Sequence, residues 1–459
     1  MLSTSPPAHT PTPSSIFGRQ LLPVTIGIIA LVFLAAFEAL AVTTVMPTIS
    51  AALNGQSLYA VAFAGPLAIG VVGMVAAGNW SDRSGPVRVV LTAGALFIVG
   101  LVIAGTATSM QILVVGRLIH GLGGGAVSVA LYVVVARIYP QQLHPRIFAA
   151  FSAAWLVPAL VGPFIAGVVA QYFGWHWVFL GVAALVPVAV ILLAPALRTI
   201  ASGEQPGRPV VPWQLSRTAW SLAAAAAVLA ASMSAQLTGA LMWVCVVGSF
   251  VIAAVAVRPL LPAGTLTARP GLPVVIAVRG LISGAYMSAE VYLPYLLTGH
   301  FGLSPSLAGL ALTTSGVTWA AASWAQGKYP HLLSDRGSMR LGSSLVVLAI
   351  VASALTSLWD LSPLVSILGW ALAGGGMGML APRQSGRVLR LSSPEAQGFT
   401  SSALLIADSI GAALALAATG AVFAVLTSAG GTVAYTGSFI LSALLGVSAF
   451  LVAGRVHDR

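Results

Sequence analysis

Fourteen long apolar segments, separated by short polar or charged stretches, dominate this chain of 459 residues. A helix needs about 20 mostly apolar residues to cross a bilayer, and backbone groups in lipid must be hydrogen-bonded within the segment. The sequence therefore predicts an all-α membrane protein with fourteen spanning helices. We place these helices at 21–49, 57–79, 89–107, 111–138, 147–170, 176–195, 217–236, 239–257, 271–297, 305–327, 341–358, 363–389, 397–427 and 433–454.

The composition argues against a soluble protein. Only 6% of the residues are charged and 58% are hydrophobic, whereas soluble domains carry about 25% charged residues. The net charge of +11 contains no basic cluster with interleaved aromatic residues, so we expect no nucleic-acid partner. The single cysteine, Cys245, excludes an internal disulfide framework and a cysteine-rich metal site.

The sequence lacks motifs that are typical of several enzymes and of ATP-driven pumps. It contains no G-x-x-x-x-G-K-[ST], no H-E-x-x-H and no G-x-S-x-G pattern. We therefore expect neither an enzyme nor a metal or organic cofactor, and we expect that ATP does not drive the protein.

Positive charges predict the orientation of the helices, because Lys and Arg are enriched in cytoplasmic loops. With the N-terminus in the cytoplasm, eighteen of the 20 Lys and Arg residues fall on the cytoplasmic side. The other two, Arg117 and Arg279, lie inside helices, and none lies outside. We expect both termini in the cytoplasm and a multi-pass protein in a plasma or bacterial inner membrane.

An internal repeat divides the chain into two halves. Asp82 and Asp335 are 253 residues apart, as are Gly121 and Gly374, while Glu38 and Glu290 are 252 apart. Two related six-helix bundles with a site between them suit alternating access. The predicted plan is a disordered Ser/Thr/Pro-rich tail (1–20), the first bundle (21–195), a linker (196–216), an inserted helix pair (217–257), a second linker (258–270), the second bundle (271–454) and a short tail (455–459).

The segment from Gly78 to Arg88 carries a recognisable pattern, with Asp82, Arg83 and Gly85 between its ends. We place it in the loop between the second and third helices, where it resembles the major facilitator superfamily signature G-x-x-x-D-R-x-G-x-x-R. Asp335 and Arg336 repeat part of it in the second half. The carboxylate can bond a helix N-terminus or an arginine, so we expect these loops to act as a conformational switch.

Three helices carry further resemblances. Arg117, His120 and Gly121 lie in a segment similar to the superfamily's R-x-x-x-G-x-G motif, with His where Gln is frequent. Gly162, Pro163 and Gly167 partly match its antiporter motif, although Pro158 and Ala166 replace two small residues. Glu38, nine residues before Pro47, resembles the first-helix acid of the 14-helix drug:proton antiporters, in which Asp is commoner. The resemblance implies a major facilitator fold and export by exchange, driven by a proton gradient. It also implies a monomer whose partners are the lipid bilayer, protons and a small molecule.

Ionisable residues inside spanning helices are functional candidates by default. Glu38, Arg117, Glu290 and Asp408 are such residues, and we expect Glu38 and Glu290 to face a central cavity where one of them carries the coupling proton. His120 is interpreted as a structural histidine or as a proton relay. Arg279 lies about 16 Å along the helix from Glu290, too far for a direct pair, so it should bond another helix.

Aromatic and sulfur-containing side chains surround Glu290 in the sequence. Tyr286, Met287, Tyr292 and Tyr295 are either part of an adaptable cavity for hydrophobic substrates or ordinary packing residues. The favoured hypothesis is proton-coupled export of amphipathic or cationic small molecules. Proton-coupled uptake, lipid translocation and a non-transporting receptor or scaffold remain the alternatives.

Overall fold

The computed structural model describes residues 15–19, 21–202, 212–234, 236, 237, 239–329, 331–393, 397–428 and 430–456. Most of the two predicted tails, and residues 203–211 of the first linker, therefore lie outside the described part. Within that part the chain contains fourteen α-helices and no strand. The helices are α1 (Leu22–Ala52), α2 (Tyr59–Ser84), α3 (Pro86–Gly105), α4 (Met110–Ile138), α5 (His144–Tyr172), α6 (His176–Ser202), α7 (Leu215–Ser234), α8 (Gly239–Val257), α9 (Leu272–Gly299), α10 (Pro305–Lys328), α11 (Asp335–Trp359), α12 (Pro363–Leu391), α13 (Gln397–Thr427) and α14 (Val433–Ala453).

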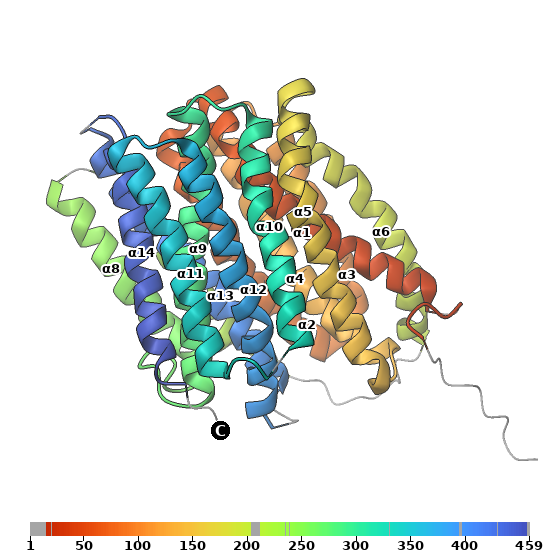
Figure 1. The fold of residues 1–459 in the computed structure, drawn as a ribbon. Helices are drawn as coiled ribbons and strands as arrows, with labels where there is room; N and C mark the ends of the chain where they lie inside the picture. The colour runs from red at the N-terminus through yellow and green to blue at the C-terminus, as the bar shows by residue number, and fades with distance from the viewer. Residues whose placement is uncertain are drawn as a thin grey trace, which may run out of the picture.

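Twelve of the described helices are long and apolar enough to cross a membrane, which makes the chain a multi-pass membrane protein. The two exceptions are α7 and α10. Helix α10 contains several Thr and Ser residues, and it is packed between α5 and α12 rather than standing alone in lipid (Figure 1). Its lower hydropathy therefore agrees with a position at the interface of two bundles.

Helix contacts repeat with a shift of eight helices, which confirms the two bundles. In the N-half, defined as α1–α6, α1 packs against α5 and α6, and α4 packs against α2 and α3. In the C-half, defined as α9–α14, α9 packs against α13 and α14, and α12 packs against α10 and α11. The halves meet along α2 with α13 and along α5 with α10.

Repeated glycines allow the close helix packing inside each half. A Cβ atom on Gly121 of α4 would lie 2.4 Å from the carbonyl oxygen of Pro66 in α2. A Cβ on Gly374 of α12 would lie 1.9 Å from the carbonyl oxygen of Ser315 in α10. Small residues let helix backbones approach in this way, so the glycine runs hold α4 against α2 and α12 against α10.

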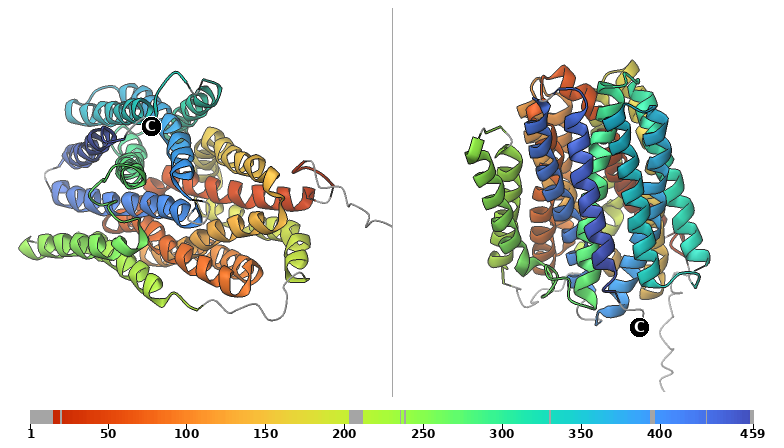
Figure 2. Two further views of the ribbon diagram at one scale, coloured as in Figure 1. Left: turned by 90° about the horizontal axis from the view of Figure 1, so that it is seen from below. Right: turned by 60° about the vertical axis from the view of Figure 1, so that its left-hand side comes forward.

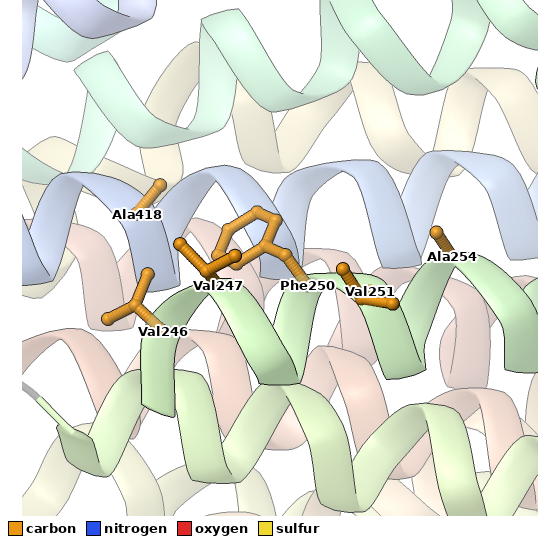
Figure 3. Close-up of a pocket in the computed structure, with 6 residues that line it drawn as sticks. All are labelled: Val246, Val247, Phe250, Val251, Ala254 and Ala418. Carbon is orange, nitrogen blue, oxygen red and sulfur yellow. The ribbon is translucent and has the colours of Figure 1, made fainter. Parts of the chain in front are cut away.

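Helices α7 and α8, the inserted pair, stand at one edge of the molecule (Figure 2). Helix α7 packs against α2, α8 and α13, whereas the main neighbour of α8 is α7. A shallow groove runs between α8 and α13 (Figure 3), and it is lined only by apolar side chains: Val246, Val247, Phe250, Val251, Ala254 and Ala418.

The two ends of the bundle differ in charge. We call the end where α1 begins the basic end and the opposite end the far end. Among the described residues, the arginines outside the helix middles gather at the basic end, as in Arg83 at the end of α2 and Arg390 at the end of α12. At the far end the halves are in contact, since the Tyr59 hydroxyl of α2 donates to the Val291 carbonyl oxygen of α9 at 2.9 Å.

Candidate functional site

A buried ion pair lies in the middle of the N-half. Nη1 of Arg117, on α4, donates to Oε1 of Glu38, on α1. Nε2 of His120 lies 3.3 Å from the second carboxylate oxygen of Glu38. The exposed fractions of Glu38, Arg117 and His120 are only 2%, 5% and 7%. The structure therefore brings together three of the residues that we selected from the sequence.

A proline explains why Arg117 is held in this orientation. Pro66 in α2 has no amide hydrogen, so the carbonyl oxygen of Ala62, one turn earlier, lacks its usual helical donor. Nε of Arg117 donates to that oxygen at 3.2 Å. The guanidinium thus bridges a freed backbone carbonyl on α2 and the carboxylate on α1, and its position is fixed by both.

His120 does not have the hydrogen bonds that we expected of a structural histidine. Neither ring nitrogen has a hydrogen-bond partner among the described residues, although the ring lies 4.4 Å from the ring of Phe97, centre to centre. Nε2 therefore lies within 3.3 Å of the Glu38 carboxylate without hydrogen-bond geometry. The buried imidazole thus lies beside the carboxylate, and neither of its ring nitrogens forms a hydrogen bond with a described residue.

The C-half places a carboxylate at the matching position but surrounds it differently. Oε1 of Glu290, on α9, accepts a hydrogen bond of 2.9 Å from the hydroxyl of Tyr286. That hydroxyl also lies 3.0 Å from Oγ of Ser315 on α10. The second oxygen of Glu290 is buried without a hydrogen-bond partner, and no cation of the described residues lies within 4.0 Å of the carboxylate.

Aromatic rings surround the tyrosine that donates to Glu290. The ring of Trp370 stacks on Tyr286 at 5.4 Å between centres, and Trp319 meets Tyr286 edge-on at 6.0 Å. Trp370 is 253 residues after Arg117, the offset of the internal repeat. We missed Trp370 in the sequence, although applying that offset to Arg117 identifies it. Of the two equivalent acids, only Glu38 is paired with an arginine.

A third charged group lies closer to the basic end. Nε of Arg279, on α9, bonds Oδ1 of Asp408 on α13 at 2.5 Å, and Oγ of Ser283 donates to the same oxygen at 2.6 Å. Nη1 of Arg279 also lies 3.4 Å from Oε1 of Gln384 on α12. The prediction that Arg279 bonds other helices rather than Glu290 is confirmed. Both Arg279 and Asp408 remain partly exposed.

The segment between α2 and α3 is shorter than we predicted. Gly78 lies inside α2, which continues to Ser84, so the expected loop is reduced to Gly85. Gly85 has a φ of 75°, a backbone conformation that favours glycine and ends the helix. Asp82 and Arg88 are exposed at this end. The guanidinium of Arg83 lies 5.4 Å from the ring centre of Trp213, which precedes α7.

The corresponding acid of the C-half is strongly bound. Asp335 begins α11 and forms ion pairs with Arg383, Arg387 and Arg390 of α12, at 3.2, 2.7 and 2.7 Å. Its neighbour Arg336 points toward the end of α14, near Gly454. These pairs join helices of the same half. Asp335 therefore joins α11 to α12 within the C-half, and it does not bridge the two halves in this conformation.

The partial antiporter motif of α5 faces the other half. A Cβ on Gly167 would lie 2.4 Å from the carbonyl oxygen of Pro305 in α10. A Cβ on Gly309 of α10 would likewise lie 2.2 Å from the carbonyl oxygen of Pro163. Gly162 instead faces Phe37 of α1 at ordinary van der Waals distance. Two of the three motif residues thus form the contact between α5 and α10.

The three residues that we assigned to one substrate cavity lie in different surroundings. Tyr286 is packed beside Glu290, and Met287 is half-buried among apolar side chains. Tyr292 lines a cavity of about 600 Å³ near the far end. Neither Glu38 nor Glu290 lines this cavity or the apolar groove. In this conformation both acids are enclosed by side chains.

Two six-helix bundles with buried acids at equivalent repeat positions have an architecture that is common among polytopic membrane transporters. The sequence profile of the Major Facilitator Superfamily matches residues 28–416, and the chain belongs to that family of transporters, not to a family of enzymes. An uncharacterized MFS-type transporter of Mycobacterium tuberculosis is 28% identical over 92% of this chain. The chain spans 63% of the length of that relative.

Three further proteins bear on the class and the fold. The multidrug efflux pump SdrM of Staphylococcus aureus is 23% identical, over 80% of this chain and 82% of its own length. Among solved structures, the POT family transporter PepTSo matches with a TM-score of 0.68 and 14% identity, over 94% of this chain and 98% of that one. An auto-inhibited POT family peptide transporter matches with the same TM-score and 15% identity. At this identity the structures support the fold alone.

Proposed function

We propose that this protein exports amphipathic or cationic small molecules across a cell membrane in exchange for protons. The observation that carries the proposal is the contrast between the two buried acids: Glu38 has an arginine partner, and Glu290 has no cation within ion-pair distance among the described residues. Burying a charge without a partner is costly. Glu290 therefore needs a cation beside it. Either a proton neutralises the carboxyl group, or a cationic substrate compensates the charge of the carboxylate.

The proposed cycle uses the two halves as rocking units. The basic end faces the cytoplasm, both termini lie there, and the far end faces outward, in agreement with the placement of Lys and Arg. Substrate enters from the basic end and displaces a proton from one of the acids. When the far end opens, protons reload the acid and substrate leaves. Arg117 also donates a hydrogen bond to the Ala62 carbonyl oxygen of α2. A shift of α2 would therefore move the guanidinium relative to the Glu38 carboxylate.

Export is favoured over uptake by two features. The α5 residues that partly match the antiporter motif make the tight contact with α10, and SdrM, a multidrug efflux pump by name, is a relative over most of the chain. Proton-coupled uptake is the second candidate, since it requires the same fold and the same buried acids. The direction of transport separates the two.

Everted membrane vesicles test direction and coupling together, with the hydrophobic cation ethidium as the probe. An exporter accumulates ethidium inside such vesicles when their interior is acidified, whereas a symporter releases it. We expect Glu290→Gln, whose side chain has no proton to exchange, to abolish gradient-driven accumulation, and Glu38→Gln, which leaves Arg117 without its counter-ion, to abolish it as well. Asp360→Asn is the matched control, because Asp360 is an exposed acid at the far end of α11. Intact accumulation by either variant would remove that acid from the coupling mechanism, and intact accumulation by Glu290→Gln would overturn the proposal.

A further inference from the structure

The cavity near the far end lies across the seam between the two halves. We call it the seam cavity; its wall includes Ser50 of α1, Tyr59 of α2, Ser232 of α7, Tyr292 of α9, and Gly420 and Phe423 of α13. The N-half, the C-half and the inserted pair each contribute to it. Its volume of about 600 Å³ is in the range of sites for drug-sized ligands.

The chemistry of the wall is aromatic and polar without charge. The rings of Tyr59 and Tyr292 are 5.9 Å apart, and Tyr292 stacks on Phe423 at 5.0 Å. Asn54, Gln56 and Thr427 add neutral hydrogen-bonding groups. Among the described residues that line it there is no ionisable acid or base other than tyrosine. Such a wall suits an uncharged molecule that has an aromatic portion and hydroxyl or amide groups.

The seam cavity exists because the far end is closed. The Tyr59 hydroxyl bonds the Val291 carbonyl oxygen, and the Tyr59 ring stacks on Tyr295 at 4.6 Å between centres. Close by, a Cβ on Gly420 would lie 2.4 Å from Cβ of Ala60. Opening the far end separates α2 from α9 and α13, so the residues that line the seam cavity no longer lie together. A ligand that needs the complete wall therefore binds the closed state better than the open one and shifts the population toward it.

We propose that the seam cavity is an inhibitory site for an uncharged, hydroxylated aromatic molecule, which locks the transporter with its far end closed. Binding at this site does not depend on the proposed direction or coupling of transport. Only the locking effect rests on the proposed alternating-access function, so the two can be tested separately.

Equilibrium dialysis of the full chain in lipid nanodiscs tests binding, with 4-methylumbelliferyl β-D-glucoside as the probe and empty nanodiscs as the blank. We expect saturable binding of this neutral aryl glucoside. The matching glucuronide, which adds a carboxylate, should bind at least tenfold more weakly because the wall offers no cation. Equal affinity for the two compounds, or no saturable binding of the glucoside, would overturn the assignment.

Two neighbouring substitutions on α13 locate the site. Ala424 lines the seam cavity from an exposed position, so Ala424→Trp fills the space without disturbing the core and should weaken glucoside binding at least tenfold. Val425 is the next residue, is 41% exposed and does not line the cavity, so Val425→Trp is the matched control and should bind normally. Glucoside binding that is unchanged by Ala424→Trp places the ligand elsewhere and contradicts the proposal.

The locking effect is measured by a distance across the far end. Spin labels at Thr108, before α4, and at Leu364, at the start of α12, report the separation of the two halves in a Cys245→Ser background. We expect the glucoside to narrow the distance distribution toward its short component. If the glucoside binds but leaves the distribution unchanged, the site is not inhibitory by locking, and the binding assignment is judged by the α13 variants alone.

Discussion

Two glutamates at equivalent positions of the internal repeat have different partners in this molecule. Glu38 is paired with Arg117, while Glu290 accepts a hydrogen bond from Tyr286 and lies near the Trp370 and Tyr286 stack. The two halves thus carry a carboxylate at equivalent positions of the chain, but its partner is an arginine in the N-half and a tyrosine hydroxyl in the C-half. A buried ion pair adds little net stability by itself, yet removing one partner strongly destabilises a protein.

Arg117→Ala is therefore expected to destabilise the protein because it leaves the Glu38 carboxylate buried without a counter-ion. Loss of one partner of a buried pair costs roughly 3–5 kcal/mol. Unfolding of the purified protein in detergent by a denaturant measures this loss. The double variant Arg117→Ala/Glu38→Gln should recover part of the stability, because it removes the uncompensated charge. If both variants are equally destabilised, the ion pair is not the reason.

At the scale of helices, close packing through glycine is the feature most open to test. Gly374 and Gly375 are adjacent in α12, but a Cβ on Gly374 would meet the Ser315 carbonyl oxygen at 1.9 Å, whereas a Cβ on Gly375 meets nothing within 4 Å. The two positions therefore separate backbone crowding from helix propensity within one helix turn.

Gly374→Ala should push α12 away from α10 and reduce stability by about 1–3 kcal/mol, the usual cost of overpacking. Gly375→Ala should leave stability unchanged or raise it by up to about 1 kcal/mol, since alanine favours the helix. Thermal unfolding in the same detergent compares the two variants. Equal midpoints for both would show that the contact between α12 and α10 is not as tight as the structure indicates.

The positions of the helices could be predicted because the length of an apolar segment determines whether it can span a membrane. The expected spans 271–297 and 305–327 match α9 and α10 to within two residues at each end. The end of α2 was misplaced, because Trp80 to Ser84 continue the helix until Gly85 ends it with a positive φ. A polar, Gly-containing segment looks like a loop in sequence. Whether it stays helical depends on the neighbouring helices, which the local pattern does not contain.

At the scale of the whole molecule, the 253-residue offset correctly indicated two related bundles, and the helix contacts of the N-half reappear in the C-half. The pairing of Glu38 with Arg117 could be anticipated in part, because both are ionisable groups inside spanning helices. The seam cavity could not be anticipated. Ser50, Tyr59 and Phe423 carry no motif, and they meet only because the two halves are closed against each other at the far end.

Substrate and protons are proposed to compete for a buried acid, and Glu290 is the one of the two without a counter-ion among the described residues. Proton release on substrate binding measures this competition without a membrane gradient. Ethidium is added to purified protein in weakly buffered detergent solution, and the pH change is followed. We predict that the native protein releases protons in proportion to bound ethidium, and that Glu290→Gln, which has no proton to displace, removes the release. Native proton release from Glu290→Gln, with ethidium still bound, would contradict this competition.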